Sequence, residues 1–400
     1  MYNRLLLLEN FIEDQHLLLL GPRQTGKSTF LKKYMPQALY IDLLDGREYL
    51  ALNQNPNILE ERIRAFIMNN NNNLQLVIID EIQKIPLLLD EAHRLTNLFK
   101  QIRFIFTGSS ARKLRTKGTN LLGGRAAKLR LYPIVSAELV SWSEKNQPIE
   151  ELLYKGGLPS VLQAKNFENF LESYVGVYLQ EEIAAEGAVR SLPNFARFLT
   201  VAALSNGEQI NFASIASDTA IPARTIHDYF QILQDTLIGD LLEPYRTTVK
   251  RKSVHAHKFY FFDVGVANIL KGTTHFQLKT TEFGKQLEHL VYCELKAALD
   301  YLQIKGNLFY WREKVTGHEV DFIIEKKQGD IIAIEVKGTN LVSQKDLKGL
   351  QAFEETCNEK NKLRKICVSS EAFARTTKEG VEIIPYAEFF KRLWNRNILD

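Results

Sequence analysis

The chain has 400 residues. This is more than one hydrophobic core usually holds, so about two to four domains are expected. Hydrophobic residues make up 45% and charged residues 24%, which excludes long disorder and fibrous repeats. The net charge of +4 is small for this length, so a nucleic-acid surface would need local clustering of lysine and arginine. Three scattered cysteines suit a reducing compartment, and no apolar run approaches the ~20 residues of a membrane helix. We therefore expect a multidomain cytoplasmic protein with no membrane partner.

Short apolar runs alternate with helical stretches from Leu17 to about Leu131. The runs are LLLL, LYIDL, LVIID and FIFTG. Each is almost continuously apolar, as strands covered on both faces are. The alternation predicts an α/β fold with a parallel sheet between layers of helices. The polar run Asn69 to Asn73 is expected to be a loop.

A glycine-rich segment follows the first of these runs and precedes the helix-like FLKKYM. It matches the P-loop pattern G-x-x-x-x-G-K-[ST], which in this strand and helix context predicts a nucleotide-phosphate site. Lys27 is expected to reach the β- and γ-phosphates of ATP, and the Ser28 hydroxyl to bind Mg²⁺. The predicted nucleotide-binding residues are Gly21, Pro22, Arg23, Gln24, Thr25, Gly26, Lys27, Ser28 and Thr29.

Two adjacent acids end the run LVIIDE. Asp80 is expected to hold the magnesium shell, and Glu81 to orient and deprotonate the attacking water, so the pair predicts ATP hydrolysis. The next run ends in FTGSSA, where Ser109, or Thr107 in its place, is the candidate sensor of the γ-phosphate. A simple turn is the alternative interpretation of that segment.

Arg125 follows a glycine pair in LLGGRAAKLRL, which we interpret as a loop. It is the candidate arginine finger, acting within its own subunit or on a neighbour in a homo-oligomer. Arg112, Arg115 and Lys128 compete with it for this role, and any of the four can be an ordinary surface charge.

The remaining chain divides by pattern into three parts. The predicted boundaries are 1–135 for the P-loop core, 136–190 for a helical lid, 191–254 for a winged helix and 255–400 for a separate α/β domain. In the last part, HEVDFIIE and DIIAIEVK are expected to be neighbouring strands joined by KQGD.

The winged-helix interpretation predicts a DNA surface. Arg224, Thr225 and His227 begin the second helix of the motif, where they would face a groove. The wing would contain RTTVKRKSVHAHK, from Arg246 to Lys258, whose cations suit phosphate contacts. The alternative is a packing module with a solvated basic loop.

Several motifs together resemble one protein family. They are GPRQTGKST, IIDEIQ, FTGSSA, GGRAAKLRLYP, KGGLP, FFDVG, EVDF and EVKG. The chain is similar, over nearly its whole length, to prokaryotic AAA-type P-loop ATPases with a C-terminal domain of unknown function. The resemblance implies an additional-strand P-loop core, a winged helix and a C-terminal domain of the restriction-endonuclease-like PD-(D/E)xK type. One departure is YLQEEI, where the family usually has an arginine-aspartate pair.

A nuclease of that type needs carboxylates for Mg²⁺ or Mn²⁺ and a lysine at the scissile phosphate. Strand alternation places Glu335 and Lys337 on one face of IIAIEVK, and Asp321 on one face of HEVDFIIE. Glu288, in a helix-like segment, is expected to be partly buried beside the sheet. These residues predict a metal site of Glu288, Asp321 and Glu335 with Lys337 as catalytic residue; ordinary exposed-face charges are the alternative.

The sequence as a whole predicts an ATP-hydrolysing protein that acts on nucleic acid, DNA rather than RNA, through a winged helix and a nuclease-like domain. An ATP-regulated switch that contacts DNA or protein partners without cleavage is the alternative.

Overall fold

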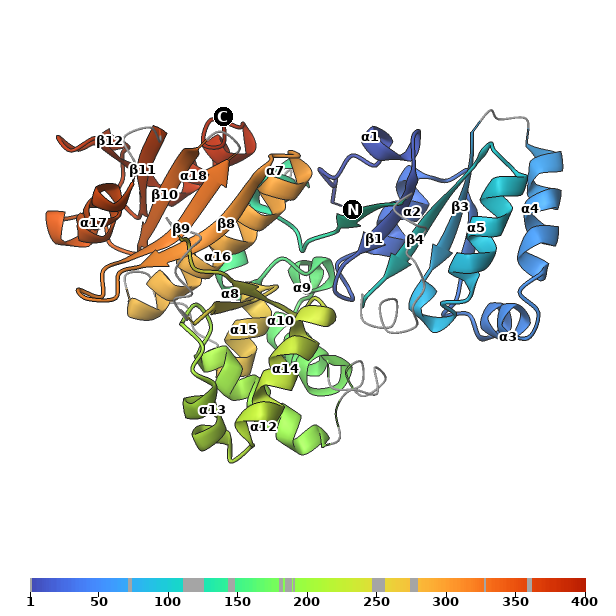
Figure 1. Ribbon diagram of the computed structural model, residues 1–400, viewed down its shortest axis with the longest axis horizontal. Helices are drawn as coiled ribbons and strands as arrows, with labels where there is room; N and C mark the ends of the chain where they lie inside the picture. Colours follow the sequence, from blue (N-terminus) through green and yellow to red (C-terminus); the bar gives the residue numbers. More distant parts are fainter. Residues whose placement is uncertain are drawn as a thin grey trace. The chain divides into compact units, whose positions relative to one another are not determined.

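The structure is a computed structural model. It describes residues 2–70, 74–110, 126–142, 148–179, 183, 189, 191–246, 256–273, 280–326, 329–357 and 362–400. The chain forms two compact units (Figure 1). Arg4–Tyr132 with Asp235–Ile238 form the N-terminal unit, and nearly all of the chain from Pro133 onwards forms the C-terminal unit.

The N-terminal unit is built on a five-stranded, wholly parallel sheet in the order β2-β3-β4-β1-β5. Its strands are β1 (His16–Leu20), β2 (Leu39–Asp42), β3 (Gln75–Asp80), β4 (Ile102–Gly108) and β5 (Ala126–Arg130). The four strands predicted from apolar runs are confirmed. The fifth, β5, was interpreted as part of a loop. It is an edge strand paired only with β1 and none of its residues is fully buried, so it lacks an apolar run.

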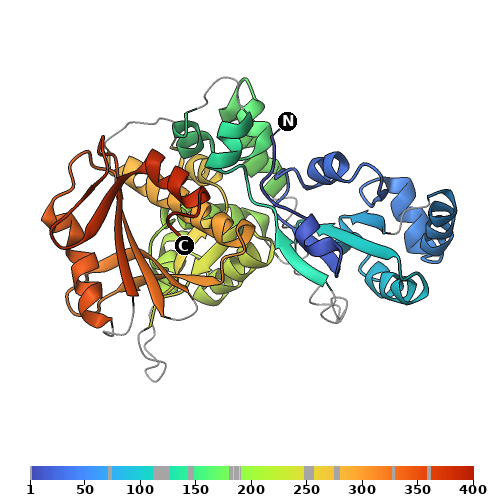
Figure 2. The same ribbon diagram turned by 90° about the horizontal axis from the view of Figure 1, so that it is seen from above.

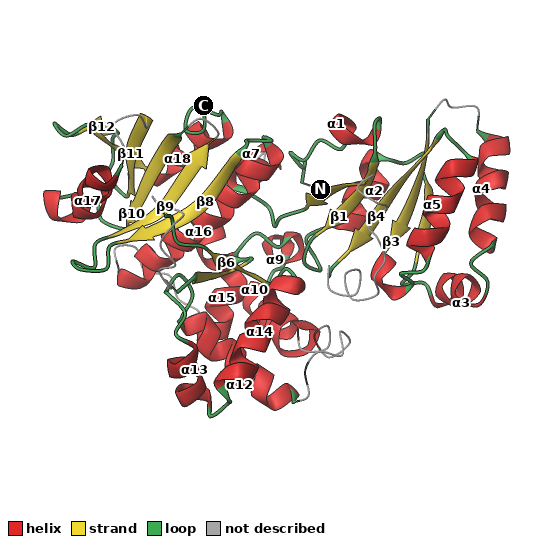
Figure 3. Cartoon of the chain, viewed as in Figure 1, coloured by secondary structure: helices red, strands yellow, loops and turns green. Residues whose placement is uncertain are grey.

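Helices connect the strands of this sheet and pack beside it (Figure 3). They are α1 (Glu9–Ile12), α2 (Lys27–Tyr34), α3 (Gly46–Gln54), α4 (Ile58–Asn69), the 3₁₀ turn η1 (Ile82–Lys84) and α5 (Leu88–Leu98). Apolar side chains from α3, α4 and α5 form one core with the strands. In α5, Leu88, Ala92 and Leu95 recur at helical spacing and are buried, so the hydrophobic face of this helix fixes it against the sheet.

The C-terminal unit begins with helices and a short hairpin. They are α7 (Ser136–Trp142), α8 (Glu150–Lys155), α9 (Pro159–Gln163), α10 (Phe167–Ser173), the π-helix η3 (Tyr174–Leu179), α12 (Leu192–Leu204), α13 (Phe212–Thr219), α14 (Ala223–Asp235), β6 (Gly239–Leu242), β7 (Lys258–Phe261) and α15 (Val264–Lys271). The predicted helical character of 136–190 is confirmed for its described residues. The four-part domain division, including the lid, stays a prediction.

Two of the motifs noted in the sequence, KGGLP and FFDVG, meet in this unit. The carboxylate of Asp263 accepts hydrogen bonds from the backbone N–H groups of Gly157, at 2.7 Å, and Val266, at 3.0 Å. Burial raises the pKa of Asp263 to about 6. A Cβ on Gly265 would lie 2.1 Å from the carbonyl oxygen of Lys155, so only glycine permits the approach. These motifs therefore hold α8 against α15.

The rest of the C-terminal unit is a six-stranded mixed sheet in the order β12-β13-β11-β10-β9-β8. Its elements are α16 (Thr281–Tyr301), β8 (Gly306–Arg312), β9 (Glu319–Lys326), β10 (Asp330–Lys337), η4 (Gln344–Leu347), α17 (Lys348–Thr356), β11 (Lys362–Ser369), β12 (Arg375–Thr376), β13 (Val381–Pro385) and α18 (Tyr386–Trp394). The predicted pairing of HEVDFIIE with DIIAIEVK is confirmed, because β9 and β10 are antiparallel neighbours.

Each face of this sheet has its own hydrophobic core. Ile332, Ile334 and Val336 of β10 face the core that contains α16 and α18. Ile331 and Ala333 face the core that contains α17, so the helices cover opposite sides of the sheet (Figure 2). Of the helices in the described residues, none is both long and apolar enough to cross a bilayer.

A buried acid joins three helices of this unit. Glu294 of α16 accepts hydrogen bonds from the Ser136 backbone N–H at 2.6 Å, the Ser136 hydroxyl at 2.8 Å and the Trp394 indole N–H at 2.6 Å. Burial raises the pKa of Glu294 from 4.5 to about 7. The folded state therefore binds the carboxyl proton of Glu294 more tightly than the unfolded state does.

We expect the stability from Glu294 to be complete below about pH 4.5 and lost as the pH rises through about 7, a change on the order of 3 kcal/mol. Glu294→Gln removes the titration, so the difference in unfolding free energy between wild type and variant should change between pH 4.5 and 8. Urea unfolding at several pH values measures it. Asp300→Asn, on the exposed end of α16, is the control. A difference that stays constant across this range would contradict the assignment.

Candidate functional site

The P-loop lies between β1 and α2. Gly26, at φ +90°, caps α2, and Gln24 also has a positive φ of 63°. These left-handed residues turn the chain sharply before the helix, whose N-terminus attracts anions. A buried arginine that the sequence analysis missed secures this turn. Arg4 donates to the carbonyl oxygens of Thr25 at 2.9 Å and Tyr132 at 2.5 Å.

Lys27, the first residue of α2, is buried within the loop. Its ammonium donates to the carbonyl oxygens of Gly21 at 2.7 Å and Pro22 at 3.0 Å. The charge is thus held inside the curve of the P-loop, where a polyphosphate chain would pass. Of the other predicted residues, Ser28 is partly buried and Thr29 is exposed.

The predicted acids lie at the same edge of the sheet as the P-loop. In the parallel sheet β4 lies between β1 and β3, so the carboxyl ends of all three strands lie at this edge. Asp80 is buried and accepts hydrogen bonds from the hydroxyls of Tyr40 and Thr107. Burial, and then the bond to Asp80, raise the pKa of Tyr40, so its phenol stays a proton donor. The Thr107 hydroxyl thus holds Asp80, the predicted magnesium ligand, in place.

Glu81 has a left-handed backbone, with φ +61°, directly after β3. Its backbone N–H donates to Thr107 Oγ1 at 3.0 Å, and its carboxylate accepts from the Gln83 side-chain amide and, at 3.5 Å, from the Ser109 hydroxyl. Gln83 also donates to Ser109 Oγ at 3.1 Å. The candidate base and candidate sensor are therefore joined through Gln83.

Neither Gln83 nor Tyr40 was predicted. The segment IIDEIQ contains a signal for Gln83, since a tight turn after the strand returns the residue two positions later to the carboxylate of Glu81. Tyr40 has no comparable signal, because it belongs to β2, which pairs with β3 on the side opposite β4.

The candidate arginine finger Arg125, and its competitors Arg112 and Arg115, lie outside the described residues. Lys128, the remaining competitor, is exposed on β5. Arg224 and His227 at the start of α14 are exposed, as a groove-facing role requires, while Thr225 is partly buried. Arg246 is also exposed, and residues 247–255 are outside the described chain.

The predicted C-terminal acids come together from three elements. Asp321 of β9 and Glu335 of β10 lie on the same face of neighbouring antiparallel strands, and Asp321 accepts from the Val336 backbone N–H at 2.8 Å. Glu288 of α16 is partly exposed beside them, with 19% of its side chain accessible. Lys337 pairs with Glu335 at 2.5 Å. His318, whose imidazole is a further candidate metal ligand in this sequence region, lies just before β9 and is partly buried.

The structure corrects the predicted role of Lys258. This residue was expected in a solvated basic wing that contacts phosphates. It is instead the first residue of β7 and only 3% exposed. Its ammonium pairs with Glu288 at 3.2 Å, with Glu319 and with Asp321 at 3.7 Å. The basic character of the run misled the prediction, because charge in a sequence does not reveal burial.

Burial raises the pKa of Glu288, while Lys258 opposes this shift. Burial, and then Asp321, raise the pKa of Glu335 well above its ordinary value. Burial disfavours the charge of Lys258, but Glu288 and the other acids raise its pKa well above the usual lysine value, so it is an ammonium. Among the described residues, no three histidine, cysteine or acidic side chains are placed to hold one metal ion. Of the three predicted metal ligands, Glu288 and Asp321 pair with Lys258, and Glu335 pairs with Lys337.

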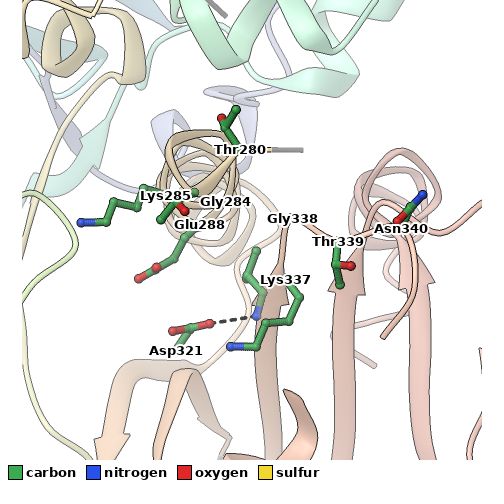
Figure 4. A pocket seen from close by; sticks show the side chains of 11 residues that line it. Thr280, Gly284, Lys285, Glu288, Asp321, Lys337, Gly338, Thr339 and Asn340 are labelled. Atoms are coloured by element: carbon green, nitrogen blue, oxygen red, sulfur yellow. Dashed lines mark hydrogen bonds between the residues drawn. The ribbon is translucent and has the colours of Figure 1, made fainter. Parts of the chain in front are cut away.

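A cavity of about 470 Å³ opens onto two of these acids, Glu288 and Asp321. Figure 4 shows Glu288, Asp321 and Lys285 around it, with Lys337 beside Asp321. The start of α16, at Thr280 and Thr281, forms another part of the wall. The cavity therefore combines carboxylates, lysines and a helix N-terminus, groups that suit both cations and phosphate oxygens.

Comparison with known proteins agrees with this geometry. Residues 13–140 match the family model of an AAA domain. Residues 146–277 match a domain of unknown function (DUF8612), and residues 283–389 match another (DUF4143). The parallel sheet, the P-loop and the AAA match define the chain as an ATP-binding protein of the AAA type with a C-terminal domain of unknown function.

Two curated relatives extend along most of the chain. An uncharacterized protein of Mycobacterium tuberculosis is 24% identical over 336 residues, covering 82% of this chain and 71% of the relative. An uncharacterized protein of Haemophilus influenzae is 21% identical over 396 residues, covering 91% of each. Among solved structures, Drosophila ORC bound to GC-rich DNA and Cdc6 matches with 9% identity and a TM-score of 0.23, covering 65% of this chain and 86% of that chain.

Proposed function

We propose that the protein hydrolyses ATP at the P-loop and uses the nucleotide cycle to act on nucleic acid. The observation that carries the first part is the meeting of Lys27, Asp80 and Glu81 at one edge of a parallel sheet. Lys27 binds the β- and γ-phosphates. Ser28 and Asp80 would hold Mg²⁺, which neutralises phosphate charge when bound.

Glu81 takes the proton of the attacking water in this proposal. Gln83 and Ser109 fix its carboxylate through the hydrogen bonds described above. Ser109 lies at the end of the neighbouring strand, so it can respond to the γ-phosphate and to the base together. Arg125 remains the proposed arginine finger, supplied in the same chain or by a neighbour in a homo-oligomer.

The nucleic-acid part of the proposal rests on the C-terminal unit. Helices α12, α13 and α14 are followed by the β6-β7 hairpin, the order of a winged helix. Arg224 and His227 are exposed at the start of α14, where such a motif contacts a groove. DNA is preferred to RNA because a helix of this kind fits the wide major groove of B-form DNA.

We expect the combined variant Lys250→Ala, Arg251→Ala and Lys252→Ala to weaken DNA binding about equally for all sequences and to flatten its salt dependence. Phosphate contacts contribute affinity without reading bases, and each lost contact lowers the slope of log affinity against log salt by about one. Fluorescence anisotropy at several salt concentrations measures both. The matched control replaces Lys345, Lys348 and Lys378, which are away from the proposed winged helix. If the affinity and the slope are unchanged, the basic run is a solvated loop that makes no phosphate contacts.

The C-terminal domain is proposed as a metal-dependent nuclease. Asp321 and Glu335, with Glu288, would hold Mg²⁺ or Mn²⁺, which activates water and stabilises charge at the scissile phosphate when bound. Lys337 lines the cavity beside Asp321 and is the group proposed to contact that phosphate.

We expect cleavage of branched, single-stranded or duplex nucleic acid with Mg²⁺ or Mn²⁺ to fall to background in Glu335→Ala and in Lys337→Ala. The first variant removes a metal ligand and the second removes the phosphate contact. Assays with and without ATP, and Lys345→Ala as an exposed control, complete the comparison. Absence of cleavage by wild type, or equal cleavage by both variants, contradicts the nuclease role.

A second function is favoured by one observation, the buried ammonium of Lys258 among the acids. A site that a lysine already neutralises suits an ATP-regulated switch that binds DNA or protein without cutting. ATP turnover that rises with added DNA, in the same assays without cleavage, would support this switch over the nuclease.

A further inference from the structure

The C-terminal acid site contains more negative charge than its exposed surface suggests. Glu288, Glu319, Asp321 and Glu335 lie around Lys258 and Lys337. Asp321 and Glu335 are buried, and Glu288 and Glu319 are partly exposed. In a low-dielectric interior, carboxylates this close repel one another strongly unless a cation lies between them. Lys258 supplies that cation for three of them.

The position of Lys258 is fixed by its backbone as well as by its charge. It pairs with Leu242 in the β6-β7 hairpin and forms a further bridge with Gln209. The ammonium also lies over the ring of Tyr310, 5.7 Å from its centre. Tyr260, two residues later on the same side of β7, donates to Glu288 at 2.6 Å. The strand therefore presents two donors to the acid site.

One acceptor of the site is left over. The Oε2 atom of Glu335 is buried and has no hydrogen-bond partner among the described residues, although Lys337 pairs with Oε1. Buried carboxylate oxygens are normally satisfied, so an unpaired one indicates a missing ligand. The 470 Å³ cavity is lined by Glu288, Asp321 and Lys337, so a small cation in it would reach the acids beside Glu335.

We propose that Lys258 is a resident cation that competes with divalent metal for the C-terminal acid site and weakens metal binding there. This inference rests on the proposed metal-dependent function of that site and adds its regulation. Glu288 and Asp321 are ligands of the ammonium, so a metal entering from the cavity competes with Lys258 for the same oxygens. The carboxylates converge on one metal ion only after the ammonium withdraws, which agrees with their present arrangement around the lysine.

The test counts Mn²⁺ ions bound to the full-length, nucleotide-free protein. Electron paramagnetic resonance of free Mn²⁺ gives the number of sites and their affinity. All proteins carry Ser28→Ala, so that the P-loop lacks its hydroxyl ligand. Lys258→Met removes the charge and keeps most of the stem, whereas Lys258→Arg keeps the charge and is the matched control.

We expect Lys258→Met to bind one additional Mn²⁺ per chain at least about 10-fold more tightly than the wild-type lysine chain does. Lys258→Arg should show no gain, and adding Asp321→Asn to Lys258→Met should remove it. Equal Mn²⁺ binding with lysine and with methionine at position 258 overturns the proposal, as does a gain that survives Asp321→Asn.

Loss of the ammonium leaves several buried acids unneutralised, so Lys258→Met can be unstable without metal. In that case circular dichroism with increasing Mn²⁺ replaces the count. Recovery of folding that depends on Mn²⁺ and on Asp321 supports the proposal, and a chain that stays unfolded at saturating Mn²⁺ overturns it.

The outcome is separate from that of the nuclease assay. If Lys258→Met gains Mn²⁺ but cuts no nucleic acid, Lys258 is the resident cation and the nuclease proposal fails. If the wild-type chain binds Mn²⁺ as tightly as Lys258→Met and cleaves nucleic acid, the nuclease proposal stands and the role of Lys258 is refuted.

Discussion

Replacing Lys27 with alanine should nearly abolish ATP binding and lower turnover by at least about 10²-fold. The ammonium lies within the curve of the P-loop, 2.7 Å from the Gly21 carbonyl oxygen, where the proposed path of the phosphates passes. Without it, the β- and γ-phosphates lose the positive charge that the P-loop itself supplies. Alanine is a good helix former, so α2 should persist.

Phosphate release and binding of a fluorescent ATP analogue measure the two effects of Lys27→Ala. Lys33→Ala is the matched control, since Lys33 is exposed on the same helix, nearly two turns away. The control should bind and turn over ATP as wild type does. Wild-type turnover by Lys27→Ala would refute the site.

The sequence was sufficient for the central strands because these are buried on both faces. Strands β1, β3 and β4 are continuous apolar runs, and the motifs at their ends identify the edge where chemistry takes place. Strand β5 could not be found in this way. It lies at the edge of the sheet, and its AAKLR segment follows two glycines that favour a loop.

Side-chain partners were predictable only where they are close in sequence. Gln83 reaches Glu81 from two residues away, so the motif IIDEIQ contains the information. Tyr40 and Arg4 reach the site from 40 and 21 residues away, through strand order and chain entry that no local pattern specifies.

The partners of a charged residue are equally hard to predict from sequence, as Lys258 shows. Its neighbours in sequence, His255 and His257, and the basic residues before them, suggest a solvated wing. Its neighbours in space are Glu288, Glu319 and Asp321, which belong to elements that begin at least 23 residues later. A buried ion pair between distant elements depends on the tertiary fold, so composition and periodicity cannot predict it.

The predicted acids do lie close together in the structure, although their role in binding metal stays a prediction. Strand alternation places Asp321 and Glu335 on the same face, and the antiparallel pairing of β9 with β10 brings those faces together. What the alternation could not supply is the identity of the cations beside these acids. The same carboxylates are compatible with Mg²⁺ and with lysine, and in the structure Asp321 pairs with Lys258 and Glu335 pairs with Lys337.

Glu81→Gln should separate binding of ATP from its hydrolysis. We expect ATP and Mg²⁺ to remain bound while turnover slows by roughly 10²-fold or more, the scale of losing a general base. Glutamine is nearly isosteric, and its amide oxygen can still accept from Gln83 and Ser109, so the turn after β3 should keep its geometry. The amide cannot take a proton from water. Single-turnover hydrolysis and equilibrium ATP binding measure the two steps, with Glu61→Gln, exposed on α4, as the control. Loss of ATP binding by Glu81→Gln would contradict the role as base, since it would place Glu81 in holding the nucleotide, and unchanged turnover would assign the proton transfer to another group.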